Sequence, residues 1–325
     1  MSRCKFRSLN YSEFLNLVEK SDFEEVVTRE HEKIMAQKVD GTFNESMKLE
    51  NRKLNRYLDM LCFDHTRVTL PAEKNRGDYI NANYVDGYEY KKKFICTQAP
   101  LQQTAYDFWR TVWMHHTRII VMMCKKKENR KQCFAYWNDI EGGDIVFGKF
   151  KITTTQIETH LSYIETTLLV TDGTSAIQEV THFVFTQWPD YGVPNDVMNL
   201  LNFILTVKSA QKDVIRQLAQ ERFKIGDNPP PIVVHCSAGV GRTGAYCLLD
   251  SAISEFDACA TISIPSTLIN IRNQRYYCIF ILPQYFFCYR VMERYVNLTV
   301  NKVSKKLIAN VATALFNKVL HLKDN

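Results

Sequence analysis

A chain of 325 residues, 46% of them hydrophobic, is long enough to bury one large core or at most two domains. The net charge of +6 is mild: it is compatible with an anionic substrate and gives no reason to expect nucleic acid. Ten cysteines without paired spacing favour a reducing compartment, and we therefore expect a cytoplasmic protein without a disulfide scaffold. We expect neither a signal peptide nor a transmembrane segment, because the N-terminus has no apolar core and apolar runs stay below about 18 residues.

Hydrophobic periodicity predicts alternating helices and strands along the chain. Helices are expected at 11–37, 105–116, 195–220, directly after Arg242, from about 265, and at 283–297. Strands are expected at 79–97 around the turn Asp86-Gly87, at 118–124, repeatedly within 134–187, and at 232–234. Strands with flanking helices and no repeat or linker predict an α/β fold on one twisted mixed sheet.

The most informative stretch is His235-Cys236-Ser237-Ala238-Gly239-Val240-Gly241-Arg242-Thr243-Gly244, here called the cysteine loop (residues 235–244). It lies between a short apolar run and the start of an apolar helix. A glycine-rich turn from strand to helix directs backbone N–H groups and the positive helix N-terminus into one concavity, which suits a phosphate. The same field stabilises a thiolate, the reactive form of Cys236.

Two further side chains in the loop extend this chemistry. The planar guanidinium of Arg242 can bind two phosphate oxygens, and the hydroxyl of Thr243 can donate to the sulfur. Together they indicate phosphoryl transfer to sulfur. The spacing from cysteine to arginine is not specific by itself, because it recurs at Cys124 and at Cys288, where the glycines are missing.

The chain from about Phe23 to Asn297 resembles the tyrosine-specific protein tyrosine phosphatases of the cysteine-dependent class. Besides the cysteine loop, the resemblance rests on motifs in the same order: Asn55-Arg56-Tyr57-Leu58-Asp59, Asp78-Tyr79-Ile80-Asn81-Ala82-Asn83, Thr97-Gln98-Ala99-Pro100-Leu101 with Asp107-Phe108-Trp109, Trp188-Pro189-Asp190, and Gln284-Tyr285. The family usually has glycine where Ala99 stands. The resemblance implies a single catalytic domain at 23–297. Outside it, apolar helical spacing predicts an N-terminal helical segment at 1–22 and a C-terminal amphipathic helical tail at 298–325.

The resemblance also implies a mechanism without metal or cofactor. Cys236 attacks phosphorus while Asp190 protonates the tyrosine oxygen, and Asp190 then acts as base when water attacks the phosphocysteine. Outside this context an Asp after Trp-Pro is more typical of a turn. Phosphate contacts are expected from Ser237, Ala238, Gly239, Val240, Gly241 and Arg242. His115-His116 lacks partners at metal-ligand spacing.

Three more residues have expected roles toward the substrates, which are tyrosine-phosphorylated proteins. Tyr57 would stack on the substrate ring and set the pocket depth, so that phosphoserine is too short; the alternative is a surface aromatic packed on its own loop. Asp59 would accept hydrogen bonds from the substrate backbone, or else cap a helix or turn. His235 would tune the thiolate through hydrogen bonds within the loop.

The sequence departs from the family in its last catalytic loop. The family has two glutamines four residues apart, but here Phe280 stands at the first position, which helps to place the hydrolytic water, and Ile281 replaces a threonine. Only Gln284 remains and could substitute. A weakly active or substrate-trapping phosphatase is therefore the alternative to full turnover. A dual-specificity or lipid phosphatase is disfavoured by Tyr57 and by a cysteine loop without lysines.

Two further regions are less determined. Lys127 stands where the family has a glutamate that pairs with the loop arginine, and Glu128 follows one residue late. The tail has one apolar helical face over 303–322 and four lysines elsewhere, Lys302, Lys305, Lys306 and Lys318, which predicts a terminal helix docked on the domain or a contact with a membrane or partner. The segment at 84–88 and the compact layout are similar to phosphatases encoded by bracoviruses.

Overall fold

The computed structural model of the protein describes residues 6–73, 76–128, 131–189, 192–220 and 228–321, and their side chains except at 127–132 and 303–321. The strands are β1 (Leu9–Asn10), β2 (Arg67–Thr69), β3 (Tyr79–Val85), β4 (Phe94–Thr97), β5 (Ile119–Met122), β6 (Lys127–Glu128), β7 (Lys131–Gln132), β8 (Asp144–Phe147), β9 (Phe150–Thr159), β10 (Tyr163–Thr171), β11 (Ile177–Phe185), β12 (Ile232–His235) and β13 (Thr261–Ile262). The helices are α1 (Tyr11–Val18), α2 (Phe23–Met35), α3 (Asn44–Met47), α4 (Leu49–Arg52), η1 (Gln102–Thr104), α5 (Ala105–Met114), α6 (Val197–Gln220), α7 (Gly241–Cys259), α8 (Ile264–Arg272) and α9 (Leu282–His321).

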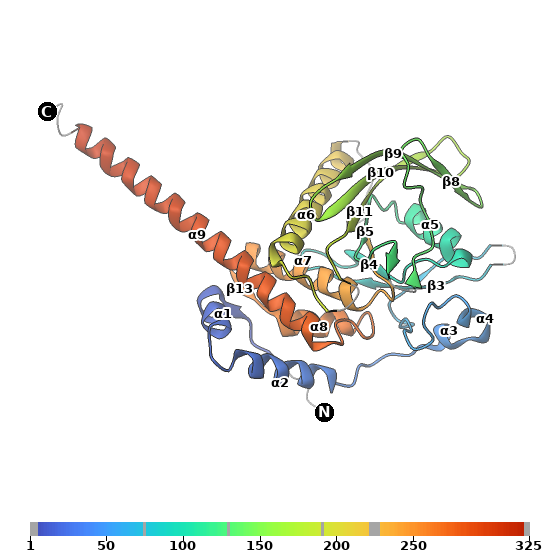
Figure 1. Ribbon diagram of the computed structural model, residues 1–325, viewed down its shortest axis with the longest axis horizontal. Coiled ribbons are helices and arrows are strands. Elements are labelled where there is room, and N and C mark those ends of the chain that lie inside the picture. The colour runs from blue at the N-terminus through green and yellow to red at the C-terminus, as the bar shows by residue number, and fades with distance from the viewer. Residues whose placement is uncertain (1–5, 74–75, 129–130, 190–191, 221–227, 322–325) are drawn as a thin grey trace.

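Within the described residues, nine strands form one mixed sheet in the order β2-β3-β4-β12-β5-β11-β10-β9-β8. The central strands β4, β12, β5 and β11 are parallel, and the outer pairs are antiparallel. Both faces of the centre are covered, with α6 and α7 on one side and α5 on the other (Figure 1). This explains why β5 and β12 are buried along their whole length and read as continuous apolar runs. The predicted α/β class with one mixed sheet is confirmed.

The topology places the cysteine loop at the carboxyl edge of the parallel strands. β12 ends at His235 and α7 begins at Gly241, so the loop fills the turn between them. Open α/β sheets bind their ligands at this edge.

The N-terminal segment packs against the last helix. The predicted helix at 11–37 is two helices, α1 and α2, separated at 19–22. The ring of Tyr289 in α9 lies 5.9 Å from that of Phe14 in α1 and 5.7 Å from that of Phe23 in α2. Helices on both sides of the boundary expected at residue 22 therefore pack on the same helix.

The last helix continues through the expected boundary at residue 298. α9 runs unbroken from Leu282 to His321, and its second half projects away from the rest of the protein (Figure 1). A terminal helix docked on the domain is therefore not observed, because apolar spacing predicts a helix but not the surface on which it packs. Among the described residues, no helix is both long and apolar enough to span a membrane.

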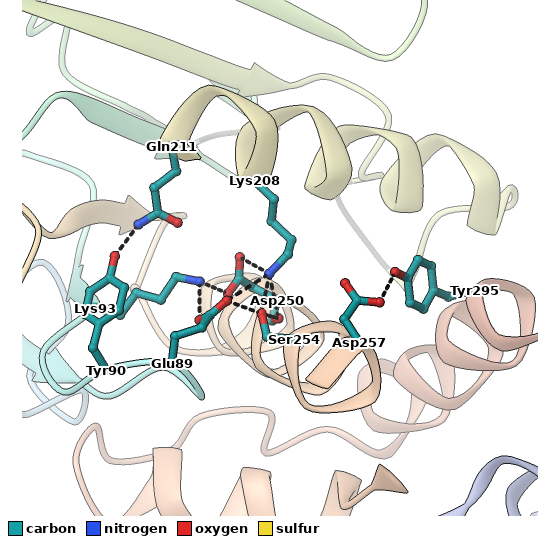
Figure 2. Close-up of polar contacts among 9 residues, drawn as sticks. All are labelled: Glu89, Tyr90, Lys93, Lys208, Gln211, Asp250, Ser254, Asp257 and Tyr295. Carbon is teal, nitrogen blue, oxygen red and sulfur yellow. Dashed lines mark hydrogen bonds and ion pairs between the residues drawn. The ribbon is translucent and has the colours of Figure 1, made fainter. Parts of the chain in front are cut away.

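An ionic cluster, buried except for Glu89, connects α7 to its neighbouring elements (Figure 2). The Nζ of Lys93, just before β4, lies 2.5 Å from a carboxylate oxygen of Asp250 in α7 and 2.9 Å from one of Glu89. From α6, Lys208 pairs with the same two carboxylates and donates to Ser254 of α7. We call Glu89, Lys93, Lys208, Asp250 and Ser254 the ionic cluster. It joins α6, α7 and the segment before β4, the elements behind the cysteine loop.

Candidate functional site

Cys236 lies at the base of the cysteine loop with only 5% of its surface exposed. The backbone N–H of Gly239 donates to its Sγ at 3.3 Å. Gly239 has φ +71°, and a Cβ at this position would lie 2.0 Å from the carbonyl oxygen of Thr97. Only glycine fits this conformation and this close approach, so the loop can turn its amide toward the sulfur.

A buried arginine that the sequence analysis did not single out orients this amide. Arg275 donates to the carbonyl oxygens of Ala238 at 3.2 Å and Gly239 at 3.1 Å, and to Oδ1 of Asn83 at 3.0 Å. In a trans peptide the C=O and the following N–H point in opposite directions. Because Arg275 holds the Ala238 carbonyl on the outer side of the loop, the Gly239 N–H faces the sulfur. No spacing in the sequence signals this contact across 36 residues.

Arg242 and Thr243 lie in the first turn of α7. Arg242 is half-buried and donates to the backbone carbonyl of Met123 at 3.4 Å. Thr243 is fully buried, and its Oγ1 has no hydrogen-bond partner in the described part of the chain. The expected bond from Thr243 to the sulfur is thus not formed in this structure, but the hydroxyl is available for it.

His235 is held from both sides of its ring. Its Nδ1 lies 3.1 Å from the carbonyl oxygen of Cys236, and its Nε2 lies 2.7 Å from the hydroxyl of Tyr136. Burial, with a smaller contribution from Arg56, lowers the pKa of His235 to about 4 even though the hydrogen bond to the Cys236 carbonyl raises it, so the ring is neutral at physiological pH.

Tyr57 is brought to the cysteine loop by its neighbours. Its hydroxyl lies 2.8 Å from Oγ of Ser237. Arg56 fixes this approach: its N–H donates to Gln98 and its guanidinium to the carbonyls of Ala99 and Pro100. Ala99 in turn donates to the carbonyl of Ser237, so two motifs far apart in sequence clamp the loop.

Other predicted site residues are less closely placed. Asp59 is exposed beside Tyr57. Asp190 lies outside the described residues. Before it, Trp188 is buried and its indole N–H donates to the carbonyl of Gly192 at 3.1 Å, which ties together the two ends of this loop.

Gln284 and Phe280 differ in position. Gln284 is buried against the loop, since a Cβ on Gly241 would lie 2.7 Å from its Oε1, and this oxygen has no partner among the described residues. Phe280 is 41% exposed and packs on the ring of Tyr277. The side chains of Lys127 and Glu128 lie outside those described.

This arrangement suits a tetrahedral anion bound in front of a sulfur. A loop amide points at the Cys236 thiol, Arg242 lies in the first turn of the helix that follows the loop, and the hydroxyl of Tyr57 reaches Ser237 in the same loop. Over the described residues, no group of three or more His, Cys, Asp or Glu side chains could hold a metal ion.

Comparison with known proteins agrees with this chemistry. The family model described as protein-tyrosine phosphatase matches residues 51–294. Tyrosine phosphatase-like protein J1 of Microplitis demolitor bracovirus is 40% identical over 289 residues, which cover 88% of this chain and 95% of that protein. Tyrosine phosphatase H3 of the same virus is 34% identical and covers 89% and 94% of the two chains. The rat tyrosine-protein phosphatase non-receptor type 9 is 38% identical over 82% of this chain and 45% of its own length.

Proposed function

We propose that this chain, which belongs to the protein-tyrosine phosphatase family, hydrolyses phosphotyrosine through a phosphocysteine intermediate on Cys236. The observation that carries this proposal is the Gly239 N–H directed at the Cys236 sulfur, with Arg242 in the first turn of α7, the helix that begins at Gly241 directly after the loop. An amide and a helix N-terminus favour the thiolate over the thiol and hold the phosphate oxygens.

In the first step the thiolate forms the S–P bond while the P–O bond to tyrosine breaks. Asp190 gives its proton to the departing phenolate, which needs one because a phenolate is a poor leaving group. Arg242 and the amides of residues 237–241 bind the phosphoryl oxygens.

In the second step a water molecule attacks phosphorus and the S–P bond breaks. Asp190, now a carboxylate, takes the proton of the water. The buried hydroxyl of Thr243 has no other partner in the described region and can donate to the departing sulfur. Gln284, whose Oε1 is similarly unpaired beside Gly241, is the side chain best placed to orient the water.

Specificity for phosphotyrosine in this proposal comes from the rim. The hydroxyl of Tyr57 is hydrogen-bonded to Ser237 of the cysteine loop, and the ring of Tyr57 stacks on the substrate ring. The exposed Asp59 accepts hydrogen bonds from the substrate backbone. We place the substrates, tyrosine-phosphorylated proteins, in the cytoplasm, because the nine described cysteines are all free thiols. The segment at 303–322, which the projecting helix α9 covers as far as His321, is proposed as a contact for a membrane or partner.

A second candidate follows from Phe280. The neighbouring Ile279 N–H bonds the carbonyl of Val240 in the cysteine loop, so the backbone here lies at the site while the side chain of Phe280 offers no hydrogen-bonding group. If Gln284 does not orient the water, the enzyme stalls as phosphocysteine and acts as a trap for phosphotyrosine proteins.

Replacement of the nucleophile tests the proposed function. Cys236→Ser keeps the loop but lacks an accessible anion, so turnover of an aryl phosphate should fall by more than about 10³-fold while phosphotyrosine peptides still bind. Cys124→Ser, with the same spacing to an arginine, should keep its activity. Turnover of Cys236→Ser within about tenfold of the parent would remove Cys236 from the role of nucleophile.

A further inference from the structure

Three buried side chains, those of His182, Tyr136 and His235, form a hydrogen-bonded series beneath the cysteine loop. The hydroxyl of Tyr136 lies 2.6 Å from Nε2 of His182 in β11 and 2.7 Å from Nε2 of His235 at the end of β12. All three side chains are inaccessible to solvent. The mechanism proposed above does not use His182, which raises the question of what it does there.

The direction of one hydrogen bond follows from the backbone. Nδ1 of His235 faces the carbonyl oxygen of Cys236, and a carbonyl can only accept, so Nδ1 carries the hydrogen. Since His235 is neutral, its Nε2 is then a bare acceptor. Tyr136 has a single hydroxyl proton and must donate it to this nitrogen.

The remaining bond is then fixed as well. With its proton given to His235, the Tyr136 oxygen can only accept from His182, so Nε2 of His182 carries the hydrogen. The other ring nitrogen agrees independently: Nδ1 of His182 is buried with no partner in the described chain. Burying an unpaired lone pair at this nitrogen costs less free energy than burying an unpaired N–H donor. In the opposite tautomer, Nε2 of His182 and Nε2 of His235 would both be acceptors for the single hydroxyl proton of Tyr136.

We propose that His182 is a positioning residue for the Cys236 site, which acts through Tyr136 to hold His235 as the Nδ1–H donor to the Cys236 carbonyl. Each donation strengthens the next in such a chain. The carbonyl it reaches belongs to the nucleophile itself, and its orientation helps to keep the loop amides on the sulfur. This inference rests on the proposed role of Cys236 as nucleophile.

The test measures the reactivity of Cys236 toward iodoacetamide across pH, followed by mass spectrometry of the Cys236 peptide. His182→Phe removes the donor and should move the midpoint of the reactivity profile to higher pH by about half a unit or more. His182→Gln restores an N–H donor and should return the midpoint toward that of the parent. Tyr136→Phe breaks the same series of hydrogen bonds and should shift the profile in the same direction.

The double variant separates action through Tyr136 from general loosening. If His182 acts through Tyr136, then His182→Phe should add no shift in a Tyr136→Phe background. An unshifted His182→Phe profile, or an equal further shift in the double variant, would overturn the inference. If His182→Phe does not fold, His182→Gln and Tyr136→Phe still decide it: an unchanged profile in Tyr136→Phe overturns it too. Failure of the proposed function is distinguishable, because it would appear as retained turnover in Cys236→Ser.

Discussion

The carbonyl of Thr97 stands against the α-carbon of Gly239, on the side where any other residue would carry its Cβ. Gly239→Ala must therefore move either β4 or the loop, and it also places alanine at φ +71°. We expect a loss of at least about 2 kcal/mol in the free energy of unfolding and at least about 100-fold in kcat/KM. Urea unfolding and steady-state kinetics measure the two effects.

Gly142 supplies the matched control. It has φ +76°, but a Cβ there meets nothing within 4 Å. Gly142→Ala should cost about 1 kcal/mol of stability and leave kcat/KM unchanged. Equal effects of the two variants would show that backbone conformation, and not the approach of Thr97, accounts for the loss at Gly239.

Replacement of Phe280 tests whether the proposed enzyme turns over or stalls as phosphocysteine. In the proposed mechanism, formation of phosphocysteine does not use this side chain, but hydrolysis needs an oriented water. We expect the parent to show a burst of phenol release before a slower steady state, and Phe280→Gln to raise the steady rate about tenfold with the burst rate constant unchanged. Rapid-mixing kinetics with an aryl phosphate measure both phases.

The exposed Ile177 at the start of β11 offers a control for the same apolar-to-amide change. Ile177→Gln should alter neither phase. Without a burst in the parent, and without faster turnover in Phe280→Gln, Gln284 already places the water, and the trapping alternative is ruled out.

Helices α6 and α7 are held by charges that would be costly to bury unpaired. Asp250 is fully buried and lies between the ammonium groups of Lys93 and Lys208. Glu89, whose pKa falls to about 2 despite its partial burial, supplies the second negative charge that neutralises the two ammonium groups. The pKa of Glu89 is lowered by Lys93, by the Ser254 hydroxyl and by Lys208, which overcome the effect of desolvation.

Removal of one partner from this ionic cluster should destabilise the protein. Asp250→Asn leaves Lys93 and Lys208 with Glu89 alone, and we expect a loss of about 3 kcal/mol in the free energy of unfolding by urea. Asp213→Asn, which breaks an exposed ion pair with Arg216 on α6, should cost about 0.5 kcal/mol or less. Similar losses in the two variants would contradict the structural role assigned to the cluster.

For the whole molecule, local patterns in the sequence predicted the elements and the family motifs, but not the contacts between distant residues. Apolar runs located β5 and β12, and the glycines of the cysteine loop located the turn between β12 and α7. Arg275 and His182 were missed because each meets the loop through contacts 36 or more residues apart, and an isolated arginine or histidine has no spacing to detect. The course of α9 was missed because amphipathic spacing does not identify a packing partner.

Five histidines make the stability of the whole protein depend on pH. Desolvation lowers the pKa of the buried His31, His182 and His235, of the half-buried His115 and of the exposed His116. For His115 and His235 the pKa falls from 6.5 to about 4. Between these values the unfolded chain binds protons that the folded protein excludes, so this contribution is complete above pH 6.5 and is lost as the pH falls toward 4.

Carboxyl groups whose pKa is raised by burial oppose this trend, whereas Glu89, whose pKa is lowered, adds to it. Burial raises the pKa of Glu30 and Asp107, which therefore favour the folded state as they become protonated, while Glu89 loses its contribution between pH 4.5 and 2. Between pH 6.5 and 5 the histidines should dominate, so the free energy of unfolding should fall over this range. Each of His115 and His235 can contribute up to about 2 kcal/mol by pH 5.

His115 is the histidine at which this can be tested away from Cys236. It lies at the C-terminal end of α5 and contacts the hydroxyl of Tyr84 at 3.0 Å. His115→Gln keeps a polar partner for Tyr84 but cannot take up a proton, so the fall in the free energy of unfolding between pH 6.5 and 5 should be smaller than in the parent. Urea titrations at four or five pH values give the two slopes. Parallel slopes in His115→Gln and the parent would mean that His115 is protonated in the folded protein as readily as in the unfolded chain.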